Sequence, residues 1–200
     1  AGPLVVSEPR FAQFSSGSTG LPKPMLYTLS QLQAHLEDFL ATLAWEFTPK
    51  MISWLPLYHD MGLIAGMLLP LYAGYPIHYL DPFEWVASPD ILLSDADALG
   101  CNVTWMPNFA FSLLSKRCAD TQASLKQWRC LSSCAEPASA DTVLEFQRTF
   151  AGRGLRSDAL AVTYAMAENI FAMSHGVIDT SDPLWKQSWP GGSPGREVVS

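Results

Sequence analysis

Residues 101–118, CNVTWMPNFAFSLLSKRC, place a short apolar run directly before a segment with helical periodicity. The pattern predicts a strand over 102–106 and a helix over 109–117. The same alternation of strand-like and helix-like segments recurs before and after residues 101–118. Further strands are predicted over 11–15, 51–55, 77–80, 129–133 and 160–164. Strands that alternate with helices favour an α/β fold, built from βαβ units around a mostly parallel sheet.

Two more helices are predicted, over 29–46 and 140–151. Thr28 or Ser30 could cap the first of them, because a side-chain oxygen there can accept from a free backbone N–H. The glycines at 152 and 154 would end the other helix, where left-handed backbone is needed.

The most apolar stretch, 61–77, is broken by Pro70 and three glycines and is shorter than a bilayer-spanning helix. It is therefore predicted as a buried helix, and no transmembrane segment is expected. From Val177 onward the sequence is rich in Pro, Gly, Ser and Asp, which predicts a loop that leaves the sheet.

The composition is that of an ordinary globular protein, with 48% hydrophobic and 16% charged residues among 200. The formal net charge is −7 and no run of Lys and Arg interrupts it, so no nucleic-acid partner is expected. The cysteines at 101, 118, 130 and 134 form no CxxC pair, which argues against a zinc site or a disulfide framework. Reduced thiols favour a cytoplasmic location.

Residues 15–23, SSGSTGLPK, combine four hydroxyl side chains, two glycines and one lysine. Glycines let backbone N–H groups approach phosphate oxygens closely, the hydroxyls donate further hydrogen bonds, and Lys23 adds a positive charge. The spacing differs from the GxxxxGKS or GxxxxGKT pattern of Walker A loops. Taken alone, such a run is more often a flexible polar turn.

The unbroken SSGSTGLPK block resembles the phosphate-binding signature of the adenylate-forming superfamily, which includes acyl-CoA synthetases, luciferases and peptide-synthetase adenylation domains. A second block, SWLPLYHDMGL at 53–63, resembles a segment typical of fatty acyl-AMP ligases. This resemblance implies that His59 lies beside the reacting carboxylate and the nucleotide α-phosphate. Without the flanking match, a His at a strand end is more often a polar cap.

Further blocks follow in the order of that family. CAEP at 134–137 resembles GAEP, whose backbone packs on the adenine, and YAMAE at 164–168 resembles YGLAE. In YGLAE the Tyr contacts the adenine and the Glu helps to hold Mg²⁺, an ion that prefers oxygen ligands. PNFAF at 107–111 is similar to a PNFAY stretch near the acyl pocket, and GSPGREV at 192–198 is similar to the region that leads out of the domain.

The resemblance implies several sets of site residues. Lys23 and His59 take catalytic roles, and Glu168 is the Mg²⁺ ligand, although an isolated Glu there is more often a solvated acid at a helix start. The implied nucleotide contacts are Ser16, Gly17, Ser18, Thr19, Gly20, Lys23, Cys134, Ala135, Glu136, Pro137, Tyr164, Ala165 and Ala167. The implied substrate contacts are His59, Trp105, Met106, Asn108 and Phe109.

The chain departs from the family pattern at three glycines, which are replaced by Pro24, Cys134 and Ala165. Each replacement adds atoms and restricts the backbone more than Gly does. The sulfur of Cys134 could intrude on the adenine slot, or the side chain could be a small buried hydrophobe.

Trp105 and Met106 stand where the family usually has a small Gly pair. On a strand they point to opposite faces, so only one of them is expected to enter the acyl channel. We predict that Trp105 enters it and favours shorter or kinked acids over long straight ones, because an indole displaces several methylene groups. The alternative is that Trp105 packs in the core.

The implied function is activation of a fatty acid to acyl-AMP with ATP and Mg²⁺, with transfer to an acyl carrier protein. An acyl-CoA synthetase and a degenerate, non-catalytic scaffold inside a larger synthase are the alternatives. The preceding N-terminal stretch, the ribose-binding Asp and the C-terminal lid domain with its Lys are not recognised within 1–200. We therefore expect a partial AMP-binding domain, part of the large N-terminal domain of such enzymes, that does not complete the reaction alone.

Overall fold

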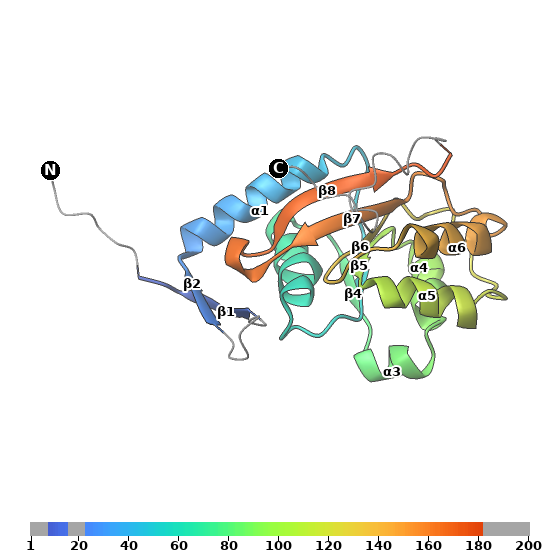
Figure 1. Cartoon of the computed structure of the whole chain (residues 1–200), viewed down its shortest axis with the longest axis horizontal. Coiled ribbons are helices and arrows are strands. Elements are labelled where there is room, and N and C mark those ends of the chain that lie inside the picture. Colours follow the sequence, from blue (N-terminus) through green and yellow to red (C-terminus); the bar gives the residue numbers. More distant parts are fainter. Residues whose placement is uncertain (1–7, 16–22, 182–200) are drawn as a thin grey trace, which may run out of the picture.

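The computed structural model of the chain describes residues 8–15 and 23–181 (Figure 1). Six strands form the main sheet in the order β4-β3-β5-β6-β7-β8. Neighbouring strands from β4 to β7 are parallel, and β8 pairs antiparallel with β7. This is the α/β architecture with a mostly parallel sheet that the alternating pattern predicts. The strands are β3 (Met51–Ser53), β4 (Ile77–Tyr79), β5 (Val103–Met106), β6 (Cys130–Ser133), β7 (Leu160–Ala165) and β8 (Ala172–Ile178).

The first predicted strand forms, but outside the main sheet. β1 (Phe11–Ser15) pairs antiparallel with β2 (Lys23–Tyr27), which the sequence pattern did not predict, in a separate two-stranded sheet. β1 buries Gln13 and exposes Ala12 and Phe14. A strand inside a parallel sheet is covered on both faces and is usually apolar throughout, which β1 is not.

β8 corrects the prediction of a loop from Val177 onward. Val177 and Ile178 belong to this strand and pair with Ala161 and Leu160 of β7. The strand carries Ser, His and Gly and buries only part of its length, so it lacks the apolar run by which the inner strands are recognised. Pairing with β7 decides its conformation.

The predicted helices form with small shifts at their ends. Thr28 caps α1 (Leu29–Leu43) in a capping box with Gln31, and the helix ends at Leu43, three residues earlier than predicted, followed by left-handed Ala44. Of the two glycines after α6 (Ala140–Ala151), Gly154 is left-handed at φ 89°, whereas Gly152 is not, at φ −65°. The third predicted helix is α5 (Asn108–Arg117), and two helices that were not predicted also form, α3 (Pro82–Ala87) and α4 (Ile91–Leu99).

The apolar stretch after residue 60 forms a largely buried helix, as predicted, but its first part is a π-helix and its second part an α-helix. A π-helix, η1 (Met61–Leu68), continues into α2 (Leu69–Ala73), which ends at left-handed Gly74. A Cβ added at Gly62 would lie 2.2 Å from the carbonyl oxygen of Pro56, so only glycine fits there. Within residues 8–15 and 23–181, no helix has both the length and the apolar character to cross a membrane.

Helices cover both faces of the main sheet, with α1 on one side and α4, α5 and α6 on the other (Figure 1). On the α1 side, Phe39 and Trp45 pack against Trp105 of β5, with ring centroids 6.1 and 5.9 Å from the indole. On the opposite side, Phe111 of α5 packs edge-on against Phe146 of α6. The central strands are therefore buried on both faces.

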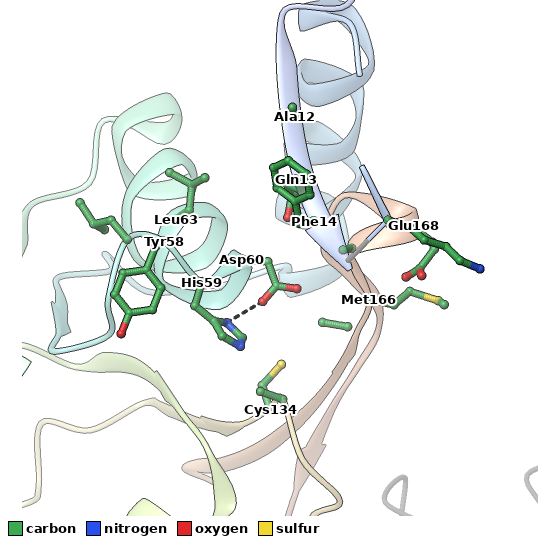
Figure 2. A pocket seen from close by; sticks show the side chains of 15 residues that line it. Ala12, Gln13, Phe14, Tyr58, His59, Asp60, Leu63, Cys134, Met166 and Glu168 are labelled. Atoms are coloured by element: carbon green, nitrogen blue, oxygen red, sulfur yellow. Dashed lines mark ion pairs between the residues drawn. The ribbon is translucent and has the colours of Figure 1, made fainter. Parts of the chain in front are cut away.

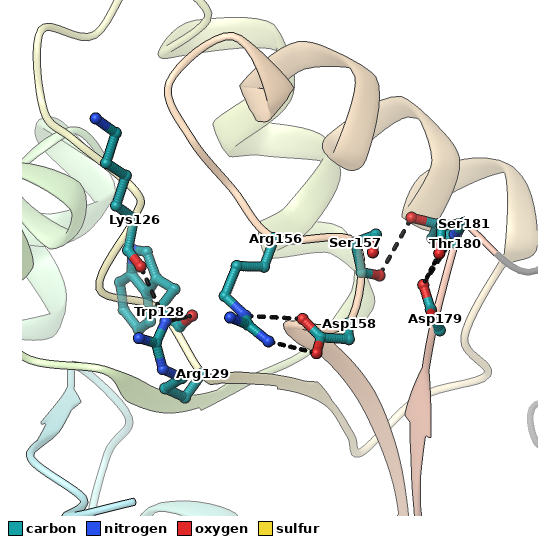
Figure 3. A network of polar contacts seen from close by, with 9 residues as sticks. All are labelled: Lys126, Trp128, Arg129, Arg156, Ser157, Asp158, Asp179, Thr180 and Ser181. Atoms are coloured by element: carbon teal, nitrogen blue, oxygen red, sulfur yellow. Dashed lines mark hydrogen bonds and ion pairs between the residues drawn. The ribbon is translucent and has the colours of Figure 1, made fainter.

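The amino edge of the sheet, where β6 and β7 begin, carries a network of polar contacts (Figure 3). The guanidinium of Arg156 forms two hydrogen bonds with the carboxylate of Asp158, at 2.8 and 2.6 Å. The backbone N–H of Thr180, just beyond β8, donates to the carbonyl of Ser157. The contact between Thr180 and Ser157 ties the end of β8 to the segment that leads into β7.

Candidate functional site

A cavity of about 680 Å³ opens at the carboxyl edge of the main sheet (Figure 2). Its walls come from the segments that follow β3, β6 and β7 and from the β1–β2 pair. Open α/β sheets bind ligands at this edge. The lining residues are Ala12, Gln13, Phe14, Lys23, Leu57, Tyr58, His59, Asp60, Leu63, Cys134, Ala135, Ala165, Met166, Ala167 and Glu168.

His59 is held by its sequence neighbour. Its Nδ1 lies 2.7 Å from Oδ1 of Asp60, the pair marked in Figure 2. The same carboxylate oxygen accepts from the backbone N–H of Met61, at the first residue of η1. The hydrogen bond to Asp60 raises the pKa of His59, and burial opposes it. Because Nδ1 contacts Asp60, Nε2 is the ring nitrogen left for a ligand. Because the pKa is raised, the imidazole carries a positive charge over a wider pH range.

Cys134 lines the same cavity, with its thiol toward His59 and Asp60 (Figure 2). The side chain is 2% exposed, and burial raises its pKa to about 12. The thiol is therefore protonated at neutral pH and behaves as a small apolar group. The next residue, Ala135, has a left-handed backbone with φ 72°, a conformation that costs a non-glycine residue about 1 kcal/mol.

Glu136 and Asn108 use their side chains to join two segments. Oε1 of Glu136 accepts from the backbone N–H of Phe109 at the start of α5, at 2.5 Å. In the other direction, Oδ1 of Asn108 accepts from the backbone N–H of Ser139, at 3.1 Å. Neither residue lines the cavity, and neither do Phe109 and Pro137. Their predicted contacts with nucleotide or substrate stay predictions.

The YAMAE segment is divided in the structure. Ala165, Ala167 and Glu168 line the cavity, whereas Tyr164 is 59% exposed and lies outside it. Glu168 belongs to the short helix η2 (Ala167–Asn169), and its carboxylate is exposed at the cavity wall. This arrangement brings Glu168 to the same cavity as Lys23 and His59, the other residues with predicted chemical roles.

Trp105 and Met106 are 1% and 0% exposed and do not line the cavity. The indole Nε1 of Trp105 donates to Oγ1 of Thr163, which also lies 2.7 Å from Oγ of Ser132. This packing supports the core interpretation of Trp105. Its predicted role in acyl-chain selection stays a prediction.

Ser16, Gly17, Ser18, Thr19 and Gly20 lie outside the described residues. The strands on either side of them are described, and both contribute to the cavity wall.

Asp60, Gln13 and Met166 are among the cavity residues that were not predicted from the sequence. Asp60 stands inside the SWLPLYHDMGL block, and its carboxylate directly after His59 is a signal that could have revealed the pair. Met166 stands inside the YAMAE block, which is a signal of the same kind. Gln13 carries no such signal, because its position depends on segments that are distant in the chain.

The chain is similar in sequence and fold to known proteins. A family model described as AMP-binding enzyme matches residues 3–198. A medium-chain-fatty-acid acyl-carrier-protein ligase, TtuA of Teredinibacter turnerae, is 30% identical over 83% of this chain. A ligase of the same kind, JamA of Moorena producens, is 34% identical over 82% of this chain.

Among solved structures, the fatty acyl-adenylate ligase of Legionella pneumophila in complex with acyl adenylate and pyrophosphate superposes with a TM-score of 0.73. It is 30% identical, and the match covers 79% of this chain and 28% of that one. The chain spans 26% of the length of TtuA and 28% of JamA, so it corresponds to about a quarter of these enzymes.

Proposed function

Because this chain belongs to the AMP-binding enzyme family, we propose that the full-length protein containing it activates a fatty acid with ATP, forming acyl-AMP and pyrophosphate. The observation that carries this proposal is the convergence of Lys23, His59 and Glu168 on one cavity at the carboxyl edge of the sheet. The three residues are separated by 36 and 109 positions in the sequence. The similarity to fatty-acid ligases supports the choice of substrate class.

In the proposed reaction, a carboxylate oxygen of the fatty acid attacks the α-phosphorus of ATP. A new bond forms between that oxygen and phosphorus as the bond to the pyrophosphate oxygen breaks. Lys23 places a positive charge at the cavity wall, and His59 presents Nε2 with Nδ1 held by Asp60. These groups are positioned before the reaction, so they stabilise the charge on the phosphates without rearrangement.

We further propose that Mg²⁺ accompanies the ATP. Glu168 fits this ion, because Mg²⁺ is usually bound through one or two carboxylates together with substrate phosphates and water. Its carboxylate is exposed at the cavity, and within the described residues it forms no ion pair. When bound, the ion supplies positive charge next to the phosphate oxygens.

We propose an acyl carrier protein as the acceptor of the acyl group, which is the acceptor named for the ligases TtuA and JamA. A non-catalytic scaffold is the second candidate. It is favoured by the side chain of Cys134, which stands in the cavity where the family has a glycine.

The test uses the full-length protein with ATP, Mg²⁺ and a series of fatty acids. Pyrophosphate release that depends on the fatty acid, with acyl-AMP identified by mass spectrometry, is the expected result. Parallel incubations with a carrier protein or with CoA separate the two acceptors. Binding of ATP without any acyl-AMP would support the scaffold, and Cys134→Gly would then be expected to restore product formation.

A further inference from the structure

Two side chains of the β1–β2 pair reach the segment that carries Glu168. Nε2 of Gln13, in β1, donates to the carbonyl oxygen of Ile170 at 2.8 Å. The hydroxyl of Tyr27, in β2, donates to the carbonyl oxygen of Ala167 at 2.5 Å. The partners are 157 and 140 positions apart in the sequence, so both hydrogen bonds join distant parts of the chain.

The two accepting carbonyls lie on either side of Glu168, at 167 and 170. The backbone between them is unusual. Ile170 has φ 66° and ψ −53°, and the N–H of Phe171 donates to the carbonyl of Asn169 at 2.6 Å. This is the γ-turn with positive φ, which is rare and strained, and a β-branched residue is especially unfavourable in it. Such a conformation persists when the surrounding contacts hold it.

Gln13 is well placed to hold this turn. It is 7% exposed, and its amide is bound to the carbonyl of the strained residue itself. Ile170 and Phe171 are 4% and 0% exposed, so the turn is also packed in the core. Loss of the Gln13 amide would leave a buried carbonyl without this donor, which is more costly than the net gain from one hydrogen bond.

The β1–β2 pair also forms part of the cavity wall, through Ala12, Gln13, Phe14 and Lys23. Lys23 is the first residue of β2, and the predicted phosphate loop connects the two strands. We propose that Gln13 and Tyr27 are positioning residues that hold the Glu168 segment against the β1–β2 pair, so that Glu168 and Lys23 face the same nucleotide. The role of these residues in the reaction rests on the proposed function. Their contact with the Glu168 segment, called docking below, does not.

The test uses Gln13→Leu and Tyr27→Phe in the full-length protein, each with a matched control. Gln147→Leu removes an amide that donates to the carbonyl of Leu155 at 3.2 Å, far from the cavity. Tyr79→Phe removes a hydroxyl that donates to the carbonyl of Gly66 at 2.6 Å. The controls therefore lose the same kind of contact outside the site.

The first measurement is amide hydrogen exchange over residues 165–172 without nucleotide. We expect exchange in this segment to rise by roughly tenfold in Gln13→Leu and Tyr27→Phe and to stay at the wild-type rate in both controls. Unchanged exchange in the two site variants would overturn the docking. This measurement does not depend on which reaction the protein catalyses.

The second measurement is pyrophosphate release at varied ATP, Mg²⁺ and fatty acid. We expect kcat/KM for ATP to fall by roughly tenfold and half-saturation to need more Mg²⁺, with the KM for fatty acid unchanged. Faster exchange with unchanged ATP kinetics would show a purely structural contact and overturn the positioning role. If the wild type releases no pyrophosphate with any acid, the proposed function fails, while the exchange result still decides the docking.

Discussion

At the amino edge of the main sheet, polar side chains bind mainly to neighbouring groups of the protein, whereas at the carboxyl edge several of them face a cavity. Arg156 and Asp158 form a bidentate pair at the amino edge, and the hydrogen bond from Arg156 lowers the pKa of Asp158. At the carboxyl edge, Lys23 and Glu168 line the cavity and form no ion pair within the described residues. The same sheet thus ends in a closed structural edge and an edge able to bind a charged ligand.

The contrast between the two edges requires that Trp105, near the carboxyl edge, belongs to the core and not to a ligand-binding channel. We expect Trp105→Gly to destabilise the full-length protein by about 3 to 5 kcal/mol, because a fully buried indole packed on Phe39 and Trp45 is removed. Urea unfolding measures this, with Trp105→Phe as the milder control. If stability is retained and longer fatty acids are accepted, Trp105 belongs to the acyl channel, as the sequence predicted.

The chemical difference between the edges is tested with two lysines. Lys23→Ala should lower fatty-acid-dependent pyrophosphate release by about 100- to 1,000-fold, because it removes a positioned charge from the cavity. Lys126→Ala at the amino edge is the matched control and should keep the rate within about twofold. Equal rates for Lys23→Ala and the wild type would contradict the assignment of this cavity.

His175 lies on β8, where its Nδ1 is 2.9 Å from Oγ1 of Thr163, and burial lowers its pKa to about 4. The unfolded chain binds a proton near pH 6.5, whereas the folded protein does not until about pH 4. Stability should therefore be intact above pH 6.5 and fall by about 3 kcal/mol as the pH decreases to 4.

Urea unfolding between pH 7.5 and 4 measures this loss in the wild type and in His175→Gln. Between pH 7.5 and 4, His175→Gln should lose about 3 kcal/mol less stability than the wild type. The difference in stability between the two proteins at pH 7.5 is subtracted first. Parallel pH profiles for the two proteins would show that His175 does not cause the acid sensitivity.

The smallest effect is expected at the amino edge. Arg156→Gln removes an exposed ion pair with Asp158, and such pairs contribute little because water and salt screen them. Pyrophosphate release should be unchanged, and the urea midpoint should move only slightly. A large loss of activity would show that the two edges are coupled, and the contrast between them would fail.

Much of the site was predictable because its residues stand in local blocks directly after strands. His59 follows β3, Cys134 follows β6 and Glu168 follows β7, so a parallel sheet brings the three segments to one edge. The directions of the side chains within these blocks could not be predicted from the sequence. Glu136 stands in a recognisable block, yet its carboxylate turns to the start of α5, where a free backbone N–H is available.

By itself, the sequence determined the alternation of strands and helices, the blocks that carry the candidate site residues and the family to which the chain belongs. These follow from patterns within a few residues, where apolar spacing and small-residue turns act locally. The tertiary structure decided that β1 leaves the main sheet, that Trp105 packs against α1 and that Gln13 holds the strained turn at Ile170. Each of these depends on partners far away in the chain, because a buried amide or indole takes its position from the groups that the folded chain brings within reach.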